Sequence, residues 1–356
     1  MVLDHVIAPL ISFAEQGRLP DRLVRIGIRN LLKQRLAELE GPGVAEAAES
    51  FQAFLREVGG GPIAAVPEKA NEQHYEVPSE FFGLVLGKHR KYSCCCWYES
   101  LETGAEAIGL DDAEAQSLRL TCEHAELKDG QEILELGCGW GSLSLWMAEQ
   151  YPNSRILGVS NSNSQREYIL AEAERRGLHN LEIQTCDVND LQLMRRFDRV
   201  VSVEMFEHVR NHGLLMERIS NWLKPGGKLL VHIFCHNRFT YPFEVTDDSS
   251  WMAKYFFSGG IMPGRDLLLH YQKYLTINRT WTWDGRHYEK TSNAWLDRMD
   301  SQPGLVEKVL KEAYGDDWQM WRQRWRMFFM SCAELFGYRD GSEWFVTHYL
   351  FSRQAD

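Results

Sequence analysis

The sequence ELGCGWG occupies residues 135–141 and begins at the end of a short apolar run at 132–136. Such a run predicts a buried strand, and the apolar residues at 143–150 recur at helical spacing. Glycines between a strand and a helix allow the backbone to turn tightly and to approach a ligand closely. Ligands of open α/β sheets bind at the carboxyl ends of the strands. The stretch therefore predicts an α/β fold with a ligand site at 135–141.

The alternation of strand and helix continues on the carboxyl side of this stretch. This order requires a mainly parallel sheet with helices on both faces, because each crossover connection lays a helix against the sheet. We therefore expect a doubly wound, Rossmann-like sheet. Its strands are expected at 132–136, 155–159, 181–185, 198–203, 228–233 and 344–351, and its helices at 143–150, 164–176, 213–223 and 318–335.

The amino-terminal side of the stretch shows a different pattern. Apolar residues recur at helical spacing through 2–14 and 23–54, and the sequence GGGP at 59–62 marks a break. A short helix is expected to start at Pro78, and a longer one to span 111–127. We divide the chain into a mostly helical region at 1–110, which forms part of the active site, and a core domain at 111–356, which carries an inserted lid at about 236–300.

Composition restricts the class of partner. The net charge of −11 argues against nucleic acid, because a phosphate backbone attracts a basic surface. No apolar run reaches the ~18 residues that a membrane span needs. The eight cysteines show neither disulfide spacing nor a Cys-x-x-Cys pair. We therefore expect reduced thiols, a cytoplasmic protein and no metal site.

The spacing of the glycines indicates which cofactor the site binds. A dinucleotide fingerprint has the form Gly-x-Gly-x-x-Gly, with an acidic residue at the end of the second strand. Here the third glycine comes one residue earlier, and Ser160 and Asn161 follow the second strand. Both differences count against a dinucleotide. The Gly-x-Gly-x-Gly spacing, Asp187 after the third strand and the KPGG turn at 224–227 resemble the motifs of class I S-adenosylmethionine-dependent methyltransferases.

That resemblance implies S-adenosylmethionine as cofactor and S-adenosylhomocysteine as its product. The glycines would approach the amino acid half of the cofactor. Asp187 would bind the adenine amino group, and Asn161 and Gln165 would meet the ribose and the base. The residues that the resemblance places around the cofactor are Tyr92, Ser93, Gly137, Gly139, Gly141, Asn161, Gln165, Asp187 and Val188.

Two carboxylates and a histidine follow the fourth expected strand, in the sequence SVEMFEHVRN at 202–211. They are Glu204, Glu207 and His208. A carboxylate three or four residues from a histidine can share a helical face with it. Such a group can accept a proton and hold a cation, whereas a capped, solvated helix start is the alternative interpretation.

Further segments extend the resemblance along most of the chain: YEVP at 75–78, SCCCWY at 93–98, CEHAELKDG at 122–130, NSNSQ at 161–165, FEH at 206–208, DDSSW at 247–251, FGY at 336–338 and the run at 344–351. Together they resemble the coclaurine N-methyltransferase family, within the cyclopropane fatty acid synthase superfamily. In that family the positions matching Tyr75, Glu204, Glu207 and His208 bind and deprotonate the substrate amine. The resemblance thus implies methyl transfer to the nitrogen of a small, aromatic amine, and it is compatible with a homodimer.

A second branch of the superfamily implies a different acceptor. Cyclopropane synthases use a bound bicarbonate ion as the base. The positions that match its site are Cys94, Glu207, His232 and Tyr288, with the backbone near Phe234. Each of His232 and Tyr288 can equally pack in a core. The alternative function is therefore methylation or cyclopropanation of an unsaturated acyl chain of a lipid, with bicarbonate as the base.

Overall fold

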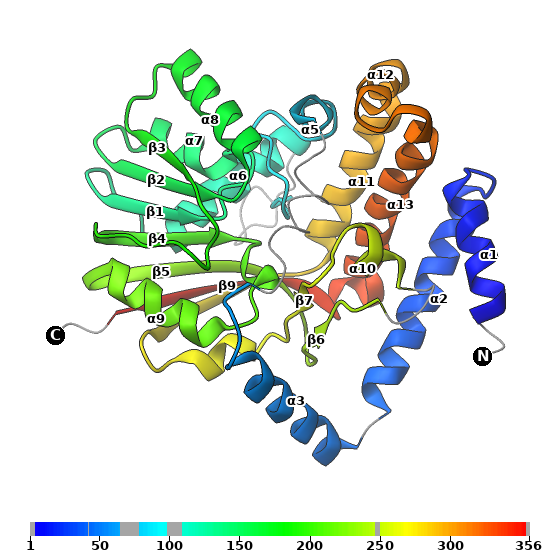
Figure 1. Ribbon diagram of the computed structural model, residues 1–356, viewed down its shortest axis with the longest axis horizontal. Helices are drawn as coiled ribbons and strands as arrows, with labels where there is room; N and C mark the ends of the chain where they lie inside the picture. Colours follow the sequence, from blue (N-terminus) through cyan, green and yellow to red (C-terminus); the bar gives the residue numbers. More distant parts are fainter. Residues whose placement is uncertain (1–3, 42, 65–77, 98–108, 246–249, 354–356) are drawn as a thin grey trace.

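The computed structural model describes residues 4–41, 43–64, 78–97, 109–245 and 250–353. Its centre is a seven-stranded sheet with the order β3-β2-β1-β4-β5-β9-β8 (Figure 1). The strands are β1 (Glu132–Leu136), β2 (Arg155–Ser160), β3 (Leu181–Thr185), β4 (Phe197–Val203), β5 (Leu223–His236), β8 (Thr276–Trp283) and β9 (Trp344–Ser352).

The strands from β3 to β5 all run parallel, β9 runs in the opposite direction, and β8 runs in the same direction as β5. β1 pairs with β2 and β4, β2 also pairs with β3, and β4 with β5. β9 lies antiparallel between β5 and β8. The doubly wound, Rossmann-like class I methyltransferase sheet predicted from the alternation of elements is confirmed.

Helices cover both faces of this sheet. Ile133 packs with Leu143 and Met147, whereas the next residue, Leu134, packs in a separate cluster with Leu215 and Ile219. Consecutive strand residues point to opposite faces, so one strand supplies two cores. The helices of the first face are α6 (Leu110–His124), α7 (Ser142–Gln150) and α8 (Asn163–Arg176), and the opposite face carries α9 (His212–Trp222).

A second group of helices stands beyond one end of the strands (Figure 1). Their shared core is largely aromatic: Trp325 contacts Phe81, with ring centroids 4.9 Å apart, and Trp295 contacts Phe329. Arg25 also donates to Glu334 and Asn293. The helices are α1 (Asp4–Glu15), α2 (Asp21–Glu40), α5 (Ser79–Val85), α11 (Arg286–Ser301), α12 (Pro303–Tyr314) and α13 (Trp318–Phe336).

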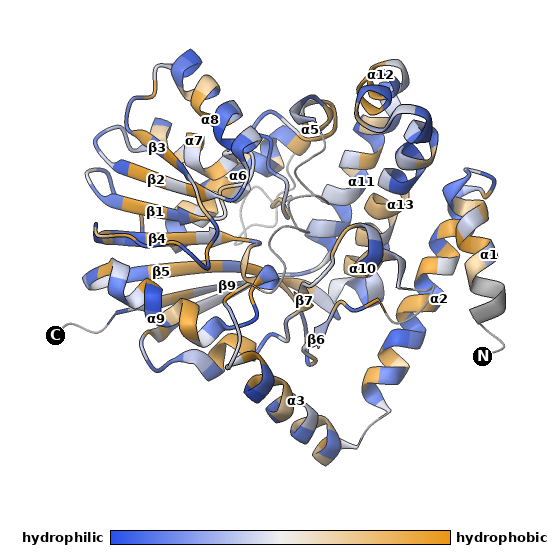
Figure 2. Ribbon diagram, in the orientation of Figure 1, coloured by the Kyte–Doolittle hydropathy of each residue, from blue (hydrophilic) through white to orange (hydrophobic). Residues whose placement is uncertain are grey.

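Smaller elements complete the described chain. Hydrophobic residues follow the central strands, whereas the outer helices alternate polar and apolar positions (Figure 2). Among the helices of the described ranges, none has both the length and the apolar character to cross a bilayer. The smaller elements are α3 (Val44–Val58), α10 (Trp251–Tyr255), β6 (Tyr241–Pro242), β7 (Ile261–Met262) and the 3₁₀ turns Phe206–His208, Leu267–Tyr271, Gly315–Asp317 and Tyr338–Gly341.

The structure differs from three sequence predictions. The helix expected at 23–54 is interrupted between Glu40 and Val44, where glycine and proline disfavour a helix. The turn expected at 224–227 is an irregular part of β5. Part of the expected insertion at 236–300 belongs to the main sheet, because β8 pairs with β9.

Candidate functional site

The glycine turn after β1 allows neighbouring groups to approach its backbone closely. Gly137, Gly139 and Gly141 all have positive φ, of 79°, 51° and 77°. The Gly137 N–H donates to Val159 at the end of β2, which holds the turn against the sheet. A Cβ on Gly141 would lie 2.6 Å from Ile169 Cγ1, so α7 can approach α8 here only with glycine.

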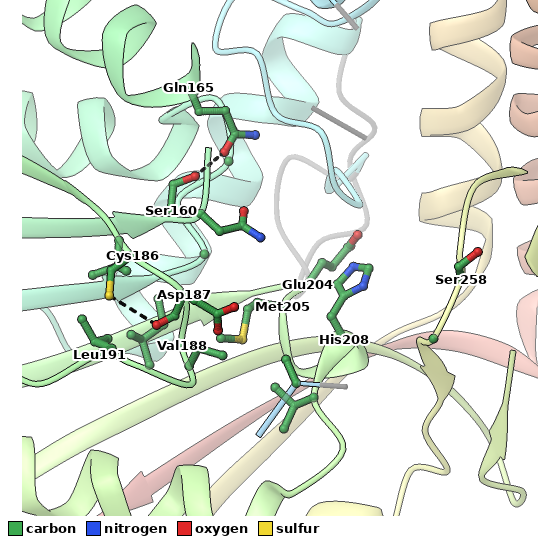
Figure 3. Close-up of a pocket in the computed structure, with 18 residues that line it drawn as sticks. Ser160, Gln165, Cys186, Asp187, Val188, Leu191, Glu204, Met205, His208 and Ser258 are labelled. Carbon is green, nitrogen blue, oxygen red and sulfur yellow. Dashed lines mark hydrogen bonds between the residues drawn. The ribbon is translucent and has the colours of Figure 1, made fainter. Parts of the chain in front are cut away.

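One part of a cleft opens above this turn, at the carboxyl ends of β1, β2 and β3. It encloses about 860 Å³, part of which is open to solvent. Ser160 Oγ donates to Gln165 Oε1 at 2.6 Å, as Figure 3 shows. The Gln165 Nε2 donor is buried without a protein partner among the described residues, and it is therefore available to a ligand. Predicted cofactor residues that line this part are Gly137, Gly139, Asn161, Gln165, Asp187 and Val188.

The cleft continues past the glycines toward the segment before α6. This second part is lined by Lys91, Tyr92, Ser93 and Trp140, and it shares Gly137, Gly139, Gln165 and Glu204 with the first part. All the predicted cofactor residues therefore line the cleft, except Gly141, which packs behind the turn. A pocket of this shape, glycine-edged and with free polar groups, fits an adenosyl cofactor with an amino acid tail.

Glu114 supports this second part of the cleft, and no motif in the sequence pointed to it. Its carboxylate accepts from the backbone N–H groups of Gly87, His89 and Lys91, at 2.9, 2.7 and 3.1 Å. Burial raises the pKa of Glu114 to about 7. The three hydrogen bonds fix the loop that carries Lys91, Tyr92 and Ser93 into the cleft.

Glu204 lies at the inner end of the cleft, next to His208 (Figure 3). It follows β4 with φ of +48°, in the left-handed region that favours glycine. Its carboxylate is held by three groups from distant elements. The Cys94 N–H donates to Oε1 at 2.8 Å, the Tyr288 hydroxyl donates to Oε2 at 2.7 Å, and His232 Nε2 lies 3.2 Å from Oε1.

Glu207 is fully buried, but it has fewer partners. Its Oε1 accepts from the Phe234 N–H at 2.8 Å, and its Oε2 has no partner among the described residues. Burial, and next the charge of Glu204, raises the pKa of Glu207 well above its usual value. Burial also raises the pKa of Glu204, but Lys91, Cys94 and Tyr288 oppose that shift. Of the two carboxyl groups, Glu204 is therefore the one with more groups that stabilise a negative charge.

His208 borders the same space from the 3₁₀ turn Phe206–His208. Burial lowers its pKa to about 4, so the imidazole is neutral at pH 7 and can accept a proton or a hydrogen bond. Its ring packs against Phe257, with centroids 4.7 Å apart, and Phe257 packs against Phe234. Tyr75, the fourth predicted catalytic residue, lies outside the described residues.

The groups predicted to hold bicarbonate lie around two protein carboxylates, and the bicarbonate site stays a prediction. The donors of Cys94, His232 and Tyr288 all surround the Glu204 carboxylate, and the Phe234 N–H binds Glu207. A protein carboxylate already uses the hydrogen bonds that an external anion would need. Within the described ranges, no group of three or more His, Cys, Asp or Glu side chains could hold a metal ion.

Comparisons with known proteins agree with this geometry. Residues 65–342 match the family model described as mycolic acid cyclopropane synthetase. The chain is 34% identical to (S)-coclaurine N-methyltransferase of Thalictrum flavum subsp. glaucum, over 98% of this chain and 96% of that protein. It is 29% identical to cyclopropane-fatty-acyl-phospholipid synthase of Escherichia coli (strain K12), over 80% of this chain and 68% of that protein. A crystal structure of coclaurine N-methyltransferase bound to N-methylheliamine and S-adenosylhomocysteine has a TM-score of 0.91 and 33% identity, and covers 98% of this chain and 100% of its own.

Proposed function

The chain belongs to the mycolic acid cyclopropane synthetase family, and from this premise we propose that it transfers a methyl group to the nitrogen of a small aromatic amine. It is an S-adenosylmethionine-dependent methyltransferase, as its relatives are. The two branches of the family differ in the group that gives up its electrons to the methyl carbon. One end of the cleft, which we call the acceptor end, is formed by Glu204, His208, His232 and Tyr288. Its side chains favour an amine as the methyl acceptor.

The observation that carries this proposal is the buried Glu204 carboxylate. An amine in water is mostly protonated at neutral pH, and it must lose that proton before its nitrogen can attack. Glu204 borders the cleft as an anion, so it can attract the ammonium and then take its proton. An alkene carries neither a charge to attract nor a proton to lose before attack.

The protein's part in the reaction follows from these positions. The ammonium proton moves to Glu204 or to the neutral imidazole of His208, and the freed nitrogen lone pair faces the cofactor part of the cleft. Bound S-adenosylmethionine supplies the electrophilic methyl group. A positioned base of this kind contributes about 10²–10⁴-fold to the rate. Burial and the charge of Glu204 raise the pKa of Glu207, which favours a single negative charge on this pair of carboxyl groups.

Aromatic side chains beside His208 favour an aromatic acceptor. The rings of His208, Phe257 and Phe234 pack in series, and Phe336 extends the series from α13, with its ring 6.0 Å from that of Phe234. Aromatic pairs prefer offset or edge-to-face contacts, which a ring-bearing amine can join. The relative of known structure binds N-methylheliamine, an amine, in its crystals.

We propose that no bicarbonate takes part. The Glu204 carboxylate accepts the hydrogen bonds that would otherwise bind the ion, and it supplies the basic oxygen itself. We further propose that the region 1–110 forms part of the active site, because the Cys94 N–H and the Lys91 loop come from it. Tyr75 in the same region stays a predicted catalytic residue. The homodimer and the cytoplasmic location also stay predictions.

The experiment offers two kinds of acceptor to the purified protein with S-adenosylmethionine. A panel of aromatic amines is one kind, and vesicles of unsaturated phospholipid are the other. We expect a mass gain of one methyl group on an amine, at a rate that bicarbonate depletion does not change. A bicarbonate-dependent mass gain on the lipid, with none on any amine, would overturn the proposal.

A further inference from the structure

Lys91 is a buried ammonium group beside the acceptor end of the cleft. Only 2% of the residue is exposed, although lysine is rarely buried without a charged partner. Its Nζ donates to Ser93 Oγ and, at 2.7 Å, to the Cys94 carbonyl oxygen. Both acceptors are neutral, so these hydrogen bonds alone do not balance its charge.

Besides the backbone hydrogen bond of Lys91 to Glu114, a second connection to a carboxylate runs from the Lys91 ammonium through Cys94. The Cys94 carbonyl accepts from Lys91 Nζ, and the Cys94 N–H donates to Glu204 Oε1 at 2.8 Å. Lys91 and Glu204 also line the same part of the cleft. One short stretch of backbone thus links an ammonium and a carboxylate whose residues line the same part of the cleft.

We propose that Lys91 is the resident cation that keeps Glu204 ionised in its buried setting, so that Glu204 can take the proton of the amine. This inference rests on the proposed function. Lys91 is a positioning residue in this role, because it acts through Glu204 and not on the amine itself. The proton leaves the ammonium nitrogen and forms a bond with a Glu204 oxygen, and Lys91 loses nothing.

The other groups that the structure describes around Glu204 do not supply a positive charge. Burial holds the pKa of His208 at about 4 and that of His232 well below its usual value, so both rings are neutral at pH 7. Burial raises the pKa of the thiols and of the tyrosine. Among the influences that lower the pKa of Glu204, that of Lys91 is the largest. Within the described ranges, the titratable groups that face Glu204 are Lys91, Cys94, Cys95, Glu207, His208, His232, Tyr288 and Cys332.

The test compares three changes by the pH dependence of kcat. Lys91→Met keeps the length of the side chain and removes the charge, and Lys91→Arg keeps the charge. Lys88→Met is the matched control, since Lys88 lies in the same loop but is exposed. An opposite charge close to a carboxylate lowers its pKa by about 1–3 units. For Lys91→Met, we expect the acidic limb of the pH dependence of kcat to shift to higher pH by about one pH unit or more. At high pH, kcat should approach that of the wild type.

For Lys91→Arg and Lys88→Met, we expect the acidic limb of the kcat profile to lie at the same pH as in the wild type. A lower kcat in Lys91→Met with an unmoved limb would overturn the inference, because a structural role lowers the rate equally at every pH. Adding Lys91→Met to Glu204→Gln should cost no further activity, and a further loss would also overturn it. If the wild type methylates no amine, the proposed function fails; if the wild type turns over and the limb stays, only the role of Lys91 fails.

Discussion

The two ends of the cleft are built in opposite ways. The cofactor end consists of backbone turns and short polar side chains that directly follow β1, β2 and β3, such as Gly137, Ser160 and Asp187. The acceptor end gathers charged and titratable side chains around one carboxylate. Its members Cys94, Tyr288 and His232 are 110, 84 and 28 residues away from Glu204 in the sequence.

This difference separates binding from proton chemistry. A site made of backbone groups holds the same shape and charge across a wide pH range, because N–H and C=O groups do not titrate there. A buried carboxylate with several donors works only in the pH range where it is ionised. Changes at the cofactor end should therefore alter the affinity for S-adenosylmethionine and leave the pH profile alone. Changes at the acceptor end should do the reverse.

We expect the largest effect from Glu204→Gly. The positive φ of Glu204 suits glycine, so the backbone should tolerate the change, while the loss of the base should lower kcat by about 10²–10⁴-fold. The donors of Cys94, His232 and Tyr288 then face an empty anion site, and added formate or bicarbonate should restore part of the rate. Initial rates with and without the anion, and calorimetry of S-adenosylmethionine binding, measure both effects. Near-normal turnover, or a rate loss explained by weaker cofactor binding, would contradict the comparison.

Tyr288→Phe should have the next largest effect. The change removes the hydroxyl that donates to Glu204 Oε2 at 2.7 Å, and hydrogen bonds to charged groups contribute about 1.5–3 kcal/mol. Because this donor lowers the pKa of Glu204, its loss should shift the acidic limb of kcat to higher pH and lower kcat at neutral pH by about ten- to hundredfold. Rates measured across the pH range decide the matter, and an equal loss at every pH would show that Tyr288 only packs.

Asp187→Ala tests the cofactor end. The residue lines the cleft, and its Oδ1 also accepts from the Asn189 N–H at 2.7 Å. Loss of a buried hydrogen bond to the adenine should weaken S-adenosylmethionine binding by about 1–3 kcal/mol, with the acidic limb of kcat unchanged. Calorimetry gives the Kd and thermal unfolding gives the Tm. A lower Tm with an unchanged Kd would reduce Asp187 to a turn cap.

Of the four changes, Gly139→Ala should have the smallest effect, and it should lower the stability of the protein only slightly. A Cβ on Gly139 meets no atom of the described residues within 4 Å, so only the left-handed φ should cost stability, about 1–2 kcal/mol. The methyl group would point into the cleft and should weaken cofactor binding. Gly141→Ala is the matched control, because its Cβ meets Ile169 and should lower the Tm more. An equal Kd for wild type and Gly139→Ala would place the cofactor elsewhere.

The sequence was most informative about the fold where strands alternate with helices. The strands expected at 132–136 and 181–185 coincide with β1 and β3, although β3 is an edge strand with one buried residue, because the alternation of strand and helix marks both. β8 escaped prediction because it lies outside this alternation, at the other edge of the sheet, and its polar residues Asn278, Arg279 and Thr280 are exposed. A strand with one partner and one solvated face carries no long apolar run.

The same contrast decides how much of the site could be predicted. The cofactor end follows from local spacing, so its glycines and Asp187 could be named from the sequence. At the acceptor end, the resemblance named Glu204, His232 and Tyr288 but not their mutual contact, which depends on how α11 packs against β5. Lys91 and Glu114 gave no signal at all, because a buried charge in a loop or a helix looks like a solvated one in sequence.

The run of cysteines from Cys94 to Cys96 offers a natural reporter of local opening. All three are fully buried, and burial raises the pKa of the Cys94 and Cys95 thiols. Thiol reagents react with an accessible thiolate, so modification of these residues requires the segment to detach first. The labelling rate therefore measures the free energy of that detachment, and a bound cofactor or amine should slow it. Cys186 is more accessible than these cysteines, so replacing it with serine would remove the fastest background reaction. The remaining labelling rate would then report the local opening of the acceptor end.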